Sequence, residues 1–213
     1  MILAAGLGSR MRPLTNDTPK PLLEVGGKPL IVWHIEQLKS AGFKDIVINV
    51  AYLGQQIIDH LGDGSKFGVN IVFSDEQNEG ALETAGGIVK ALDKLSETFL
   101  VVNGDIWSDY AYLNNFQLAE GKLAHLVLVD NPEHHPLGDF LLTGTERKYT
   151  FSGIAYYSKR LFEGVSYGKA PLAPLLFEAM DKHKVTTEYH KGIWHDIGTP
   201  KRLEVLDKTL KEA

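Results

Sequence analysis

Two cations and a pair of glycines near the start of the chain are residue types that bind phosphate. Gly6 and Gly8 follow a short apolar stretch. Arg10 and Lys20 come after them within the segment Leu3–Leu22. Glycines directly after a strand let backbone N–H groups approach phosphate oxygens, and the two side chains supply the positive charge that such a ligand needs. The segment therefore indicates a binding site for a phosphate-bearing ligand.

The two commonest phosphate motifs do not fit this segment. The third glycine of G-x-G-x-x-G would fall on Met11. A P-loop fails as well, because Gly27-Lys28 is followed by Pro29 instead of Ser or Thr. An ordinary strand-to-helix turn is the alternative interpretation, and two glycines alone would favour it. Further residues of suitable type favour the binding site instead: Arg10, Pro13, Thr15, Pro19 and Lys20.

A carboxylate follows another apolar stretch. Phe99–Val102 is apolar and too short for a helix, which predicts a buried strand, and Asn103-Gly104-Asp105 comes directly after it. Ligands of open α/β sheets bind beyond the carboxyl ends of strands, and Mg²⁺ prefers carboxylate and phosphate oxygens. Asp105 is therefore a candidate magnesium ligand, with a plain turn residue as the alternative. Asp109 is a weaker metal candidate, and a surface turn explains it better.

The elements that must position these residues alternate along the chain. Apolar runs predict strands at 1–4, 45–51, 69–73, 99–102, 124–130, 149–157 and 186–190. Apolar residues at spacings of three and four predict helices at 29–41, 53–61, 84–95, 171–183 and 200–210. Such alternation predicts an α/β fold with a mostly parallel sheet and helices on both faces, to which the less regular second half adds a small strand-rich lobe.

Length and composition bound the class of protein. With 213 residues, 44% of them hydrophobic and 23% charged, the chain is long enough for one α/β domain. No cysteine is present, which excludes disulfides, cysteine-ligated zinc, iron–sulfur clusters and cysteine nucleophiles. The apolar start, 1–5, is shorter than that of a signal peptide and has no basic residue before it, so we expect a cytoplasmic protein without a membrane segment.

Charge is unevenly distributed along the chain. The net charge is −5, yet residues 1–28 carry four basic and two acidic side chains, a balance of +2, which leaves −7 for residues 29–213. An acidic protein lacks the broad basic face of a nucleic-acid binder, so we expect no nucleic-acid partner. A small basic island fits a compact anionic ligand.

The glycine segment also has the pattern G-x-G-x-R-x-x-P-x-T-x-x-x-P-K. Seven residues carry it: Gly6, Gly8, Arg10, Pro13, Thr15, Pro19 and Lys20. This pattern resembles the signature of the sugar-1-phosphate nucleotidyltransferases. Segments 82–88, 102–110, 131–140 and 194–199 extend the resemblance over nearly the whole chain, toward bacterial uridylyltransferases of cell-wall (peptidoglycan) recycling. The resemblance implies a Rossmann-like three-layer fold and a reaction of UTP with N-acetylmuramic acid 1-phosphate that releases pyrophosphate.

For that reaction we expect a bound metal ion and two basic side chains. The resemblance implies Mg²⁺ as the cofactor, shared by Asp105 and the distant Asp196, for which a helix N-cap is the alternative role. Arg10 and Lys20 are the candidate catalytic residues. Because both reactants are anionic, we expect the Arg10 guanidinium to follow charge from the α-phosphorus to the leaving pyrophosphate, and Lys20 to hold the phosphates from the opposite side. A solvated loop cation is the alternative for each.

We expect different residues to bind the nucleotide and the sugar. The nucleotide-binding candidates are Leu3, Ala4, Ala5, Gly6, Gly8, Ser9, Arg10, Asn78, Thr84 and Asp105. The sugar-binding candidates are Glu83, Asn103, Asn131, Asp139 and Gly153. Many relatives have glycine where this chain has Glu83, and we expect its carboxylate to accept a hydrogen bond from a sugar hydroxyl or a base N–H. A solvated glutamate that complements a helix N-terminus is the alternative. His134 and His135 belong to a loop that we expect to shape the sugar pocket.

The resemblance also predicts how the chain is organised. Within one domain spanning 1–213, we expect residues 1–110 mainly to bind the nucleotide and 111–213 mainly to bind the sugar and close the fold. The chain lacks the Glu-Lys-Pro type sugar-site segment that many relatives carry after the central strand, and its Thr143–Lys148 connection is short. We expect a monomer or a small homo-oligomer.

Three other functions stay open at this point. One is guanylyl or thymidylyl transfer to another hexose or heptose 1-phosphate. A second is a catalytically silent sugar-nucleotide sensor, which would have no need for a metal pair. A dinucleotide-dependent oxidoreductase is the third.

Overall fold

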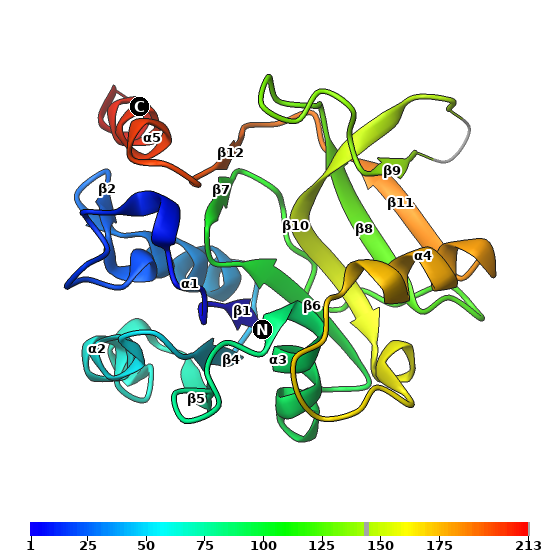
Figure 1. Ribbon diagram of the computed structural model, residues 1–213, viewed down its shortest axis with the longest axis horizontal. Helices are drawn as coiled ribbons and strands as arrows, with labels where there is room; N and C mark the ends of the chain where they lie inside the picture. Colours follow the sequence, from blue (N-terminus) through cyan, green and yellow to red (C-terminus); the bar gives the residue numbers. More distant parts are fainter. Residues whose placement is uncertain (143–144, 213) are drawn as a thin grey trace.

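A mostly parallel sheet forms the centre of the protein (Figure 1). The computed structural model describes residues 1–142 and 145–212. Within that range one sheet has eight strands. Seven follow the order β11 (Val185–Tyr189), β8 (Ala124–Val129), β10 (Lys148–Ser158), β6 (Thr98–Asn103), β1 (Ile2–Leu3), β4 (Asp45–Val50) and β5 (Asn70–Asp75), and β9 (Phe140–Leu141) pairs with β10. Strands β6, β1, β4 and β5 run parallel, β11 runs parallel to β8, and β10 is antiparallel to its neighbours.

Helices cover both faces of this sheet. One face carries α1 (Leu30–Ser40) and α2 (Gly54–Leu61), and the other carries α3 (Glu83–Ala91) and α4 (Ala173–Asp181). Successive side chains of a strand point to opposite faces. In β4, Ile46 and Ile48 therefore join the core under α1 and α2, while Val47 joins the core under α3 and α4. The predicted three-layer α/β architecture is confirmed.

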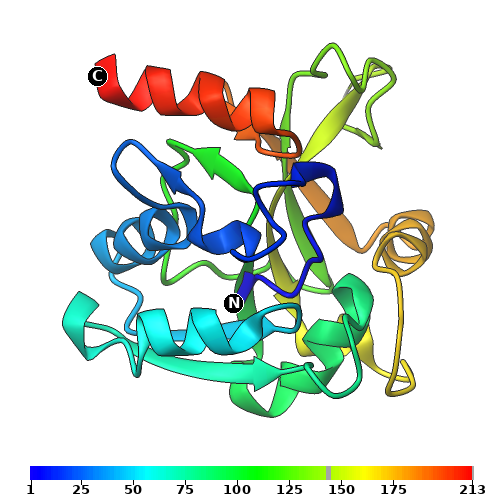
Figure 2. The same cartoon turned by 60° about the vertical axis from the view of Figure 1, so that its left-hand side comes forward.

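A third apolar cluster joins an early segment of the chain to the last described helix, and Figure 2 shows that segment and that helix side by side. Helix α5 (Pro200–Glu212) lies against the hairpin of β2 (Glu24–Val25) and β3 (Lys28–Pro29), and β7 (Ile106–Ser108) pairs with β12 (Trp194–Asp196). In this cluster Leu206 of α5 is fully buried with Val25 and Leu30. The Gly26 N–H also donates to Asp207 Oδ1 at 2.9 Å. The last helix thereby fixes the segment that follows the glycine loop.

Every strand and helix that periodicity predicts is present, with ends displaced by at most four residues. The short strands β2, β3, β7, β9 and β12 are additional, because two or three residues show no period. Residues 143 and 144 lie outside the described residues, so the short Thr143–Lys148 connection stays a prediction. None of the described helices is long and apolar enough to cross a membrane.

Ile48 tests how far the parallel strands depend on the first core. Its side chain is fully buried, and its strand lies between β1 and β5. Truncation leaves a cavity, so we expect Ile48→Ala to lower the free energy of unfolding by about 2–5 kcal/mol. Val72→Ala in β5 is the control, because that side chain is 39% exposed and its loss should cost about 0.5 kcal/mol. Urea unfolding measures both, and equal losses would contradict this placement of the core.

Candidate active site

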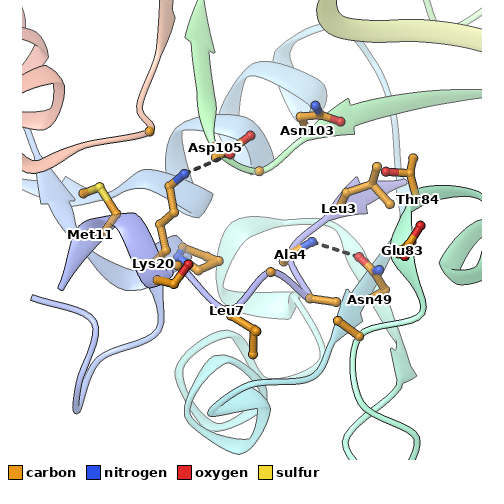
Figure 3. Close-up of a pocket in the computed structure, with 18 of the residues that line it drawn as sticks. Leu3, Ala4, Leu7, Met11, Lys20, Asn49, Glu83, Thr84, Asn103 and Asp105 are labelled. Atoms are coloured by element: carbon orange, nitrogen blue, oxygen red, sulfur yellow. Dashed lines mark hydrogen bonds and ion pairs between the residues drawn. The ribbon is translucent and has the colours of Figure 1, made fainter. Parts of the chain in front are cut away.

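A cavity of about 390 Å³ lies at the carboxyl ends of the four parallel strands (Figure 3). Its walls are the loop after β1, the ends of β4, β5 and β6, and the start of α3. Because parallel strands end at the same edge, residues from distant parts of the sequence meet here. Twelve candidate residues line it: Leu3, Ala4, Ala5, Gly6, Gly8, Ser9, Arg10, Lys20, Glu83, Thr84, Asn103 and Asp105.

Thr15 holds the glycine loop in shape. Gly8 has φ +59°, in the left-handed region that favours glycine, and a β-carbon there would lie 3.0 Å from Thr15 Cγ2 and 3.3 Å from Lys20 Cβ. The Thr15 hydroxyl, on a fully buried side chain, donates to the Gly8 carbonyl at 2.8 Å. These three members of the sequence pattern thus pack on one another, which explains why their types occur together.

Lys20 and Asp105 form an ion pair across the cavity (Figure 3). Lys20 begins a 3-10 helix, Lys20–Leu22, whereas Asp105 follows β6. Lys20 Nζ lies 2.9 Å from Asp105 Oδ2, and the lysine side chain is only 11% exposed. The structure therefore joins the candidate phosphate cation to the candidate metal ligand.

The small sheet of β7 and β12 brings the second carboxylate to the first. Asp196 stands opposite Ile106 in the register of these strands, and the Ile197 N–H donates to the Asp105 carbonyl at 2.8 Å. The two aspartates therefore occupy neighbouring backbone positions although they are far apart in the sequence. The N-cap alternative for Asp196 is wrong, because that residue ends a strand and α5 begins only at Pro200.

Two side chains from different segments hold Asp196. Arg202 Nη1 lies 2.5 Å from Asp196 Oδ2, and His134 Nε2 lies 3.1 Å from the same oxygen. A β-carbon on Gly198 would lie 3.2 Å from Arg10 Nη1 and 2.5 Å from Arg202 Nη2. Both guanidinium groups therefore border Gly198, which itself lines the cavity, and they concentrate positive charge at this end of it.

The available donors fit magnesium. Among the described residues, no group of three or more His, Cys, Asp or Glu side chains is arranged to hold a metal alone. Mg²⁺ commonly uses one or two carboxylates and completes its shell with substrate phosphates and water. Asp105 and Asp196 each form their ion pair through Oδ2. Oδ1 of each carboxylate is a second oxygen that could coordinate the metal. The two aspartates therefore fit a magnesium ion that is completed by a bound phosphate.

Glu83 has a backbone conformation that glycine adopts more easily. It begins α3 with φ +61°, which costs a non-glycine residue about 1–2 kcal/mol. The residue lines the cavity beside Thr84. Strain of this kind concentrates at functional positions, which favours a role for the carboxylate in the cavity over a solvated glutamate.

The other candidate residues lie outside the lining of the cavity: Asn78, Asn131, Asp139, Gly153 and Asp196. Asp139 Oδ2 accepts from the Phe151 N–H of β10 at 2.8 Å. Asn131 Nδ2 donates to the Pro136 carbonyl in its own loop and to the Lys148 carbonyl at the start of β10, so both residues tie the loop between β8 and β9 to β10. A β-carbon on Gly153 would lie 2.8 Å from Asn103 Nδ2, so this glycine lets β10 approach a lining residue. The roles of these residues in sugar binding stay predictions.

Sequence reasoning missed two polar residues that line the cavity, Asn49 and Glu76. Asn49 lies near the end of β4, and Glu76 directly follows β5. Both are buried. A polar residue that follows a predicted strand is the signal that pointed to Asp105, and the same signal could have found Glu76. Asn49 lies inside the predicted strand 45–51, so this signal does not point to it.

Comparison with known proteins shows the family to which this fold belongs. A model of the nucleotidyl transferase family matches residues 1–140, and the chain belongs to that family. Its relatives place it among the sugar-1-phosphate nucleotidyltransferases, so the chain is an enzyme of this class and the resemblance seen in the sequence is confirmed.

Two relatives are similar over nearly their whole length. The chain is 51% identical to the N-acetylmuramate alpha-1-phosphate uridylyltransferase of Neisseria meningitidis serogroup B, over 96% of this chain and 94% of that protein. It is 32% identical to the enzyme of the same description from Caulobacter vibrioides, over 100% and 97% of the two chains. A solved structure from Bacillus anthracis, assigned as a glucose-1-phosphate thymidylyltransferase, has the same fold, with a TM-score of 0.86, 22% identity, and coverage of 100% and 94%.

His34 gives the region behind Asp105 a pH dependence. Burial lowers the pKa of His34 to about 4, against the opposing effect of the Asp105 charge. Between that value and the ordinary 6.5, the unfolded chain binds a proton at this residue and the folded protein does not. We therefore expect stability to fall as the pH drops through this window, by about 2 kcal/mol from this group between pH 7 and pH 5. Urea unfolding at pH 7 and pH 5 measures this loss, and it should be smaller in His34→Leu than in the wild type. Equal losses in the two proteins would show that His34 is not the group responsible for the pH dependence.

Proposed function

We propose that the protein transfers a uridylyl group from UTP to N-acetylmuramic acid 1-phosphate and releases pyrophosphate. The observation that carries this proposal is one cavity lined by a glycine loop, Arg10, Lys20 and Asp105, in a chain 51% identical to a uridylyltransferase for that sugar phosphate. Such a cavity provides backbone N–H groups and cations for a triphosphate next to carboxylates for a metal.

In the proposed reaction a phosphate oxygen of the sugar 1-phosphate attacks the α-phosphorus of UTP. A P–O bond forms at that phosphorus as the bond to the β-phosphate breaks, and pyrophosphate leaves with the electron pair. The attacking oxygen is already ionised, so no protein group has to remove a proton. Catalysis then depends on alignment of the two phosphates and on neutralisation of their charge.

The residues at the cavity divide this work. The loop around Gly6 and Gly8 offers N–H groups to the triphosphate, and the Arg10 fork follows charge onto the pyrophosphate. The Lys20 ammonium has three donors, so it can keep Asp105 and also donate to a phosphate oxygen. Mg²⁺, held by Asp105 and Asp196, supplies further neutralisation of phosphate charge when bound.

The remaining assignments follow the two substrates. The proposed nucleotide contacts are Leu3, Ala4, Ala5, Ser9, Asn78 and Thr84. The sugar is contacted by Glu83, Asn103, Asn131, Asp139 and Gly153. In one domain, 1–110 mainly bind UTP and 111–213 mainly bind the sugar. The proposal includes a cytoplasmic location and a place in cell-wall recycling, where UTP and this sugar phosphate would meet.

A matrix of nucleoside triphosphates against sugar 1-phosphates tests the substrate pair. UTP, GTP, CTP and dTTP are each combined with the 1-phosphates of N-acetylmuramic acid, N-acetylglucosamine, glucose and mannose, and pyrophosphate release is measured. We expect the highest kcat/KM for UTP with N-acetylmuramic acid 1-phosphate. High turnover of GTP with mannose 1-phosphate, and none with the proposed pair, would replace uridylyl transfer by guanylyl transfer.

Asp105→Asn tests the carboxylate that faces Lys20. The amide keeps the size of the side chain but loses the charge, so we expect kcat/KM to fall by about 10²–10³ while the circular dichroism spectrum stays unchanged. Asp109→Asn is the matched control, because Asp109 contacts His190 and does not line the cavity. Turnover that survives in Asp105→Asn would remove Asp105 from the mechanism. UTP binding without turnover in the wild type would instead indicate a sensor.

A further inference from the structure

A chain of buried hydrogen bonds links the two walls of the cavity. The Ala4 N–H donates to Asn49 Oδ1 at 2.8 Å, as Figure 3 shows, and Asn49 Nδ2 donates to Glu76 Oε1 at 2.8 Å. The other carboxylate oxygen of Glu76, Oε2, accepts from the Leu82 N–H at 2.9 Å. Glu76 is fully buried, and Asn49 and Leu82 are each 3% exposed.

The direction of every bond in this chain is fixed. Both ends, at Ala4 and Leu82, are backbone N–H groups and can only donate. An asparagine amide passes the donation on, and a carboxylate closes the chain because it accepts at both oxygens. A neutral glutamine at position 76 would have to present an NH₂ group to one of two donors.

The chain joins the two segments that face the ligand space. Ala4 leads into the glycine loop, whereas Leu82 directly precedes Glu83 and Thr84, which line the opposite wall. Helix α3 packs on the middle of the chain, because a β-carbon on Gly87 would lie 2.8 Å from both Asn49 Nδ2 and Glu76 Oε1. These bonds therefore tie the two walls of the cavity to each other.

We propose that Asn49 and Glu76 are positioning residues that set the distance between the glycine loop and the start of α3, and thereby the affinity for the nucleoside triphosphate. The Ala4 N–H is occupied by Asn49, so Ala4 contacts the nucleotide through its other backbone atoms. The inference rests on the proposed function only in that this cavity binds a nucleoside triphosphate.

A swap of the charge between the two positions tests this inference. Glu76→Gln leaves two donors facing each other whichever way the amide turns, and turning Asn49 as well moves the conflict to the Ala4 N–H. Asn49→Asp alone places two carboxylates against each other. In the double variant, Asp at 49 accepts from both Ala4 and the glutamine NH₂, and the glutamine oxygen accepts from Leu82. Every donor then has an acceptor again.

We expect each single variant to raise the KM for UTP and the dissociation constant for UTP by about tenfold or more, with the KM for the sugar 1-phosphate changed by about twofold at most. The double variant should return both UTP values to within about threefold of the wild type. Asn70→Asp is the matched control. Asn70 donates to Asp45 at the exposed amino-terminal ends of β4 and β5, far from the cavity, and its substitution also places two carboxylates against each other. It should leave the UTP values unchanged.

Several outcomes would overturn the inference. One is a double variant that does not fold, or that binds UTP as weakly as the single variants do. Another is a set of variants that changes the melting temperature while the UTP values stay constant, because Asn49 and Glu76 would then serve stability alone. If the wild type uses a different triphosphate, the proposed uridylyl transfer fails, and the same variants measured with that triphosphate still decide the role of these residues.

Discussion

Parallel pairing of β1 between β4 and β6 is the constraint on which the site depends. Only two residues of β1 are in the sheet, yet they pair with a strand on each side. Since neighbouring parallel strands end at one edge, the loop after β1 must face the ends of β4, β5 and β6. One cavity therefore brings together the glycine loop, Asn49, Glu76 and Asp105, although they are far apart in the sequence.

The charges at this edge are arranged in pairs that a phosphate ligand can rearrange. The Lys20–Asp105 pair lines the cavity, and the Arg202–Asp196 pair lies next to it, beside the lining residue Gly198. The carboxylates of these pairs are 39% exposed at Asp105 and 23% exposed at Asp196, so they stay accessible to a ligand. The contrast is Glu76, whose buried carboxylate has both oxygens bonded within the protein and serves the shape of the site.

The sequence predicts those parts of the site that are local. Gly8, Thr15 and Lys20 lie close together along the chain, and their packing follows from one short pattern. Asp105 was found because polar residues after apolar strands lie at the sheet edge. The same rule applied to β5 would have pointed to Glu76, which follows that strand. Asn49 lies inside β4, before Val50, so the rule does not reach it.

Contacts set by long-range register could not be read in this way. The β7–β12 pairing places Asp196 beside Asp105, and His134 and Arg202 reach Asp196 from two further segments. These strands have three residues each and show no period, so nothing in the sequence fixes their partners. Asp139 has suitable chemistry for a sugar, yet its Oδ2 accepts from the Phe151 N–H and so ties its loop to β10.

A crystal structure of the protein with a non-hydrolysable UTP analogue, the sugar 1-phosphate and Mn²⁺ would locate both substrates and the metal in one experiment. Manganese takes the oxygen ligands of magnesium and gives an anomalous signal that locates it. We expect one manganese peak in contact with Asp105, Asp196 and the α-phosphate, with Arg10 and Lys20 bonded to the phosphates and the base between the glycine loop and the start of α3. A triphosphate bound away from this cavity, or a metal without contact to either aspartate, would contradict this expectation.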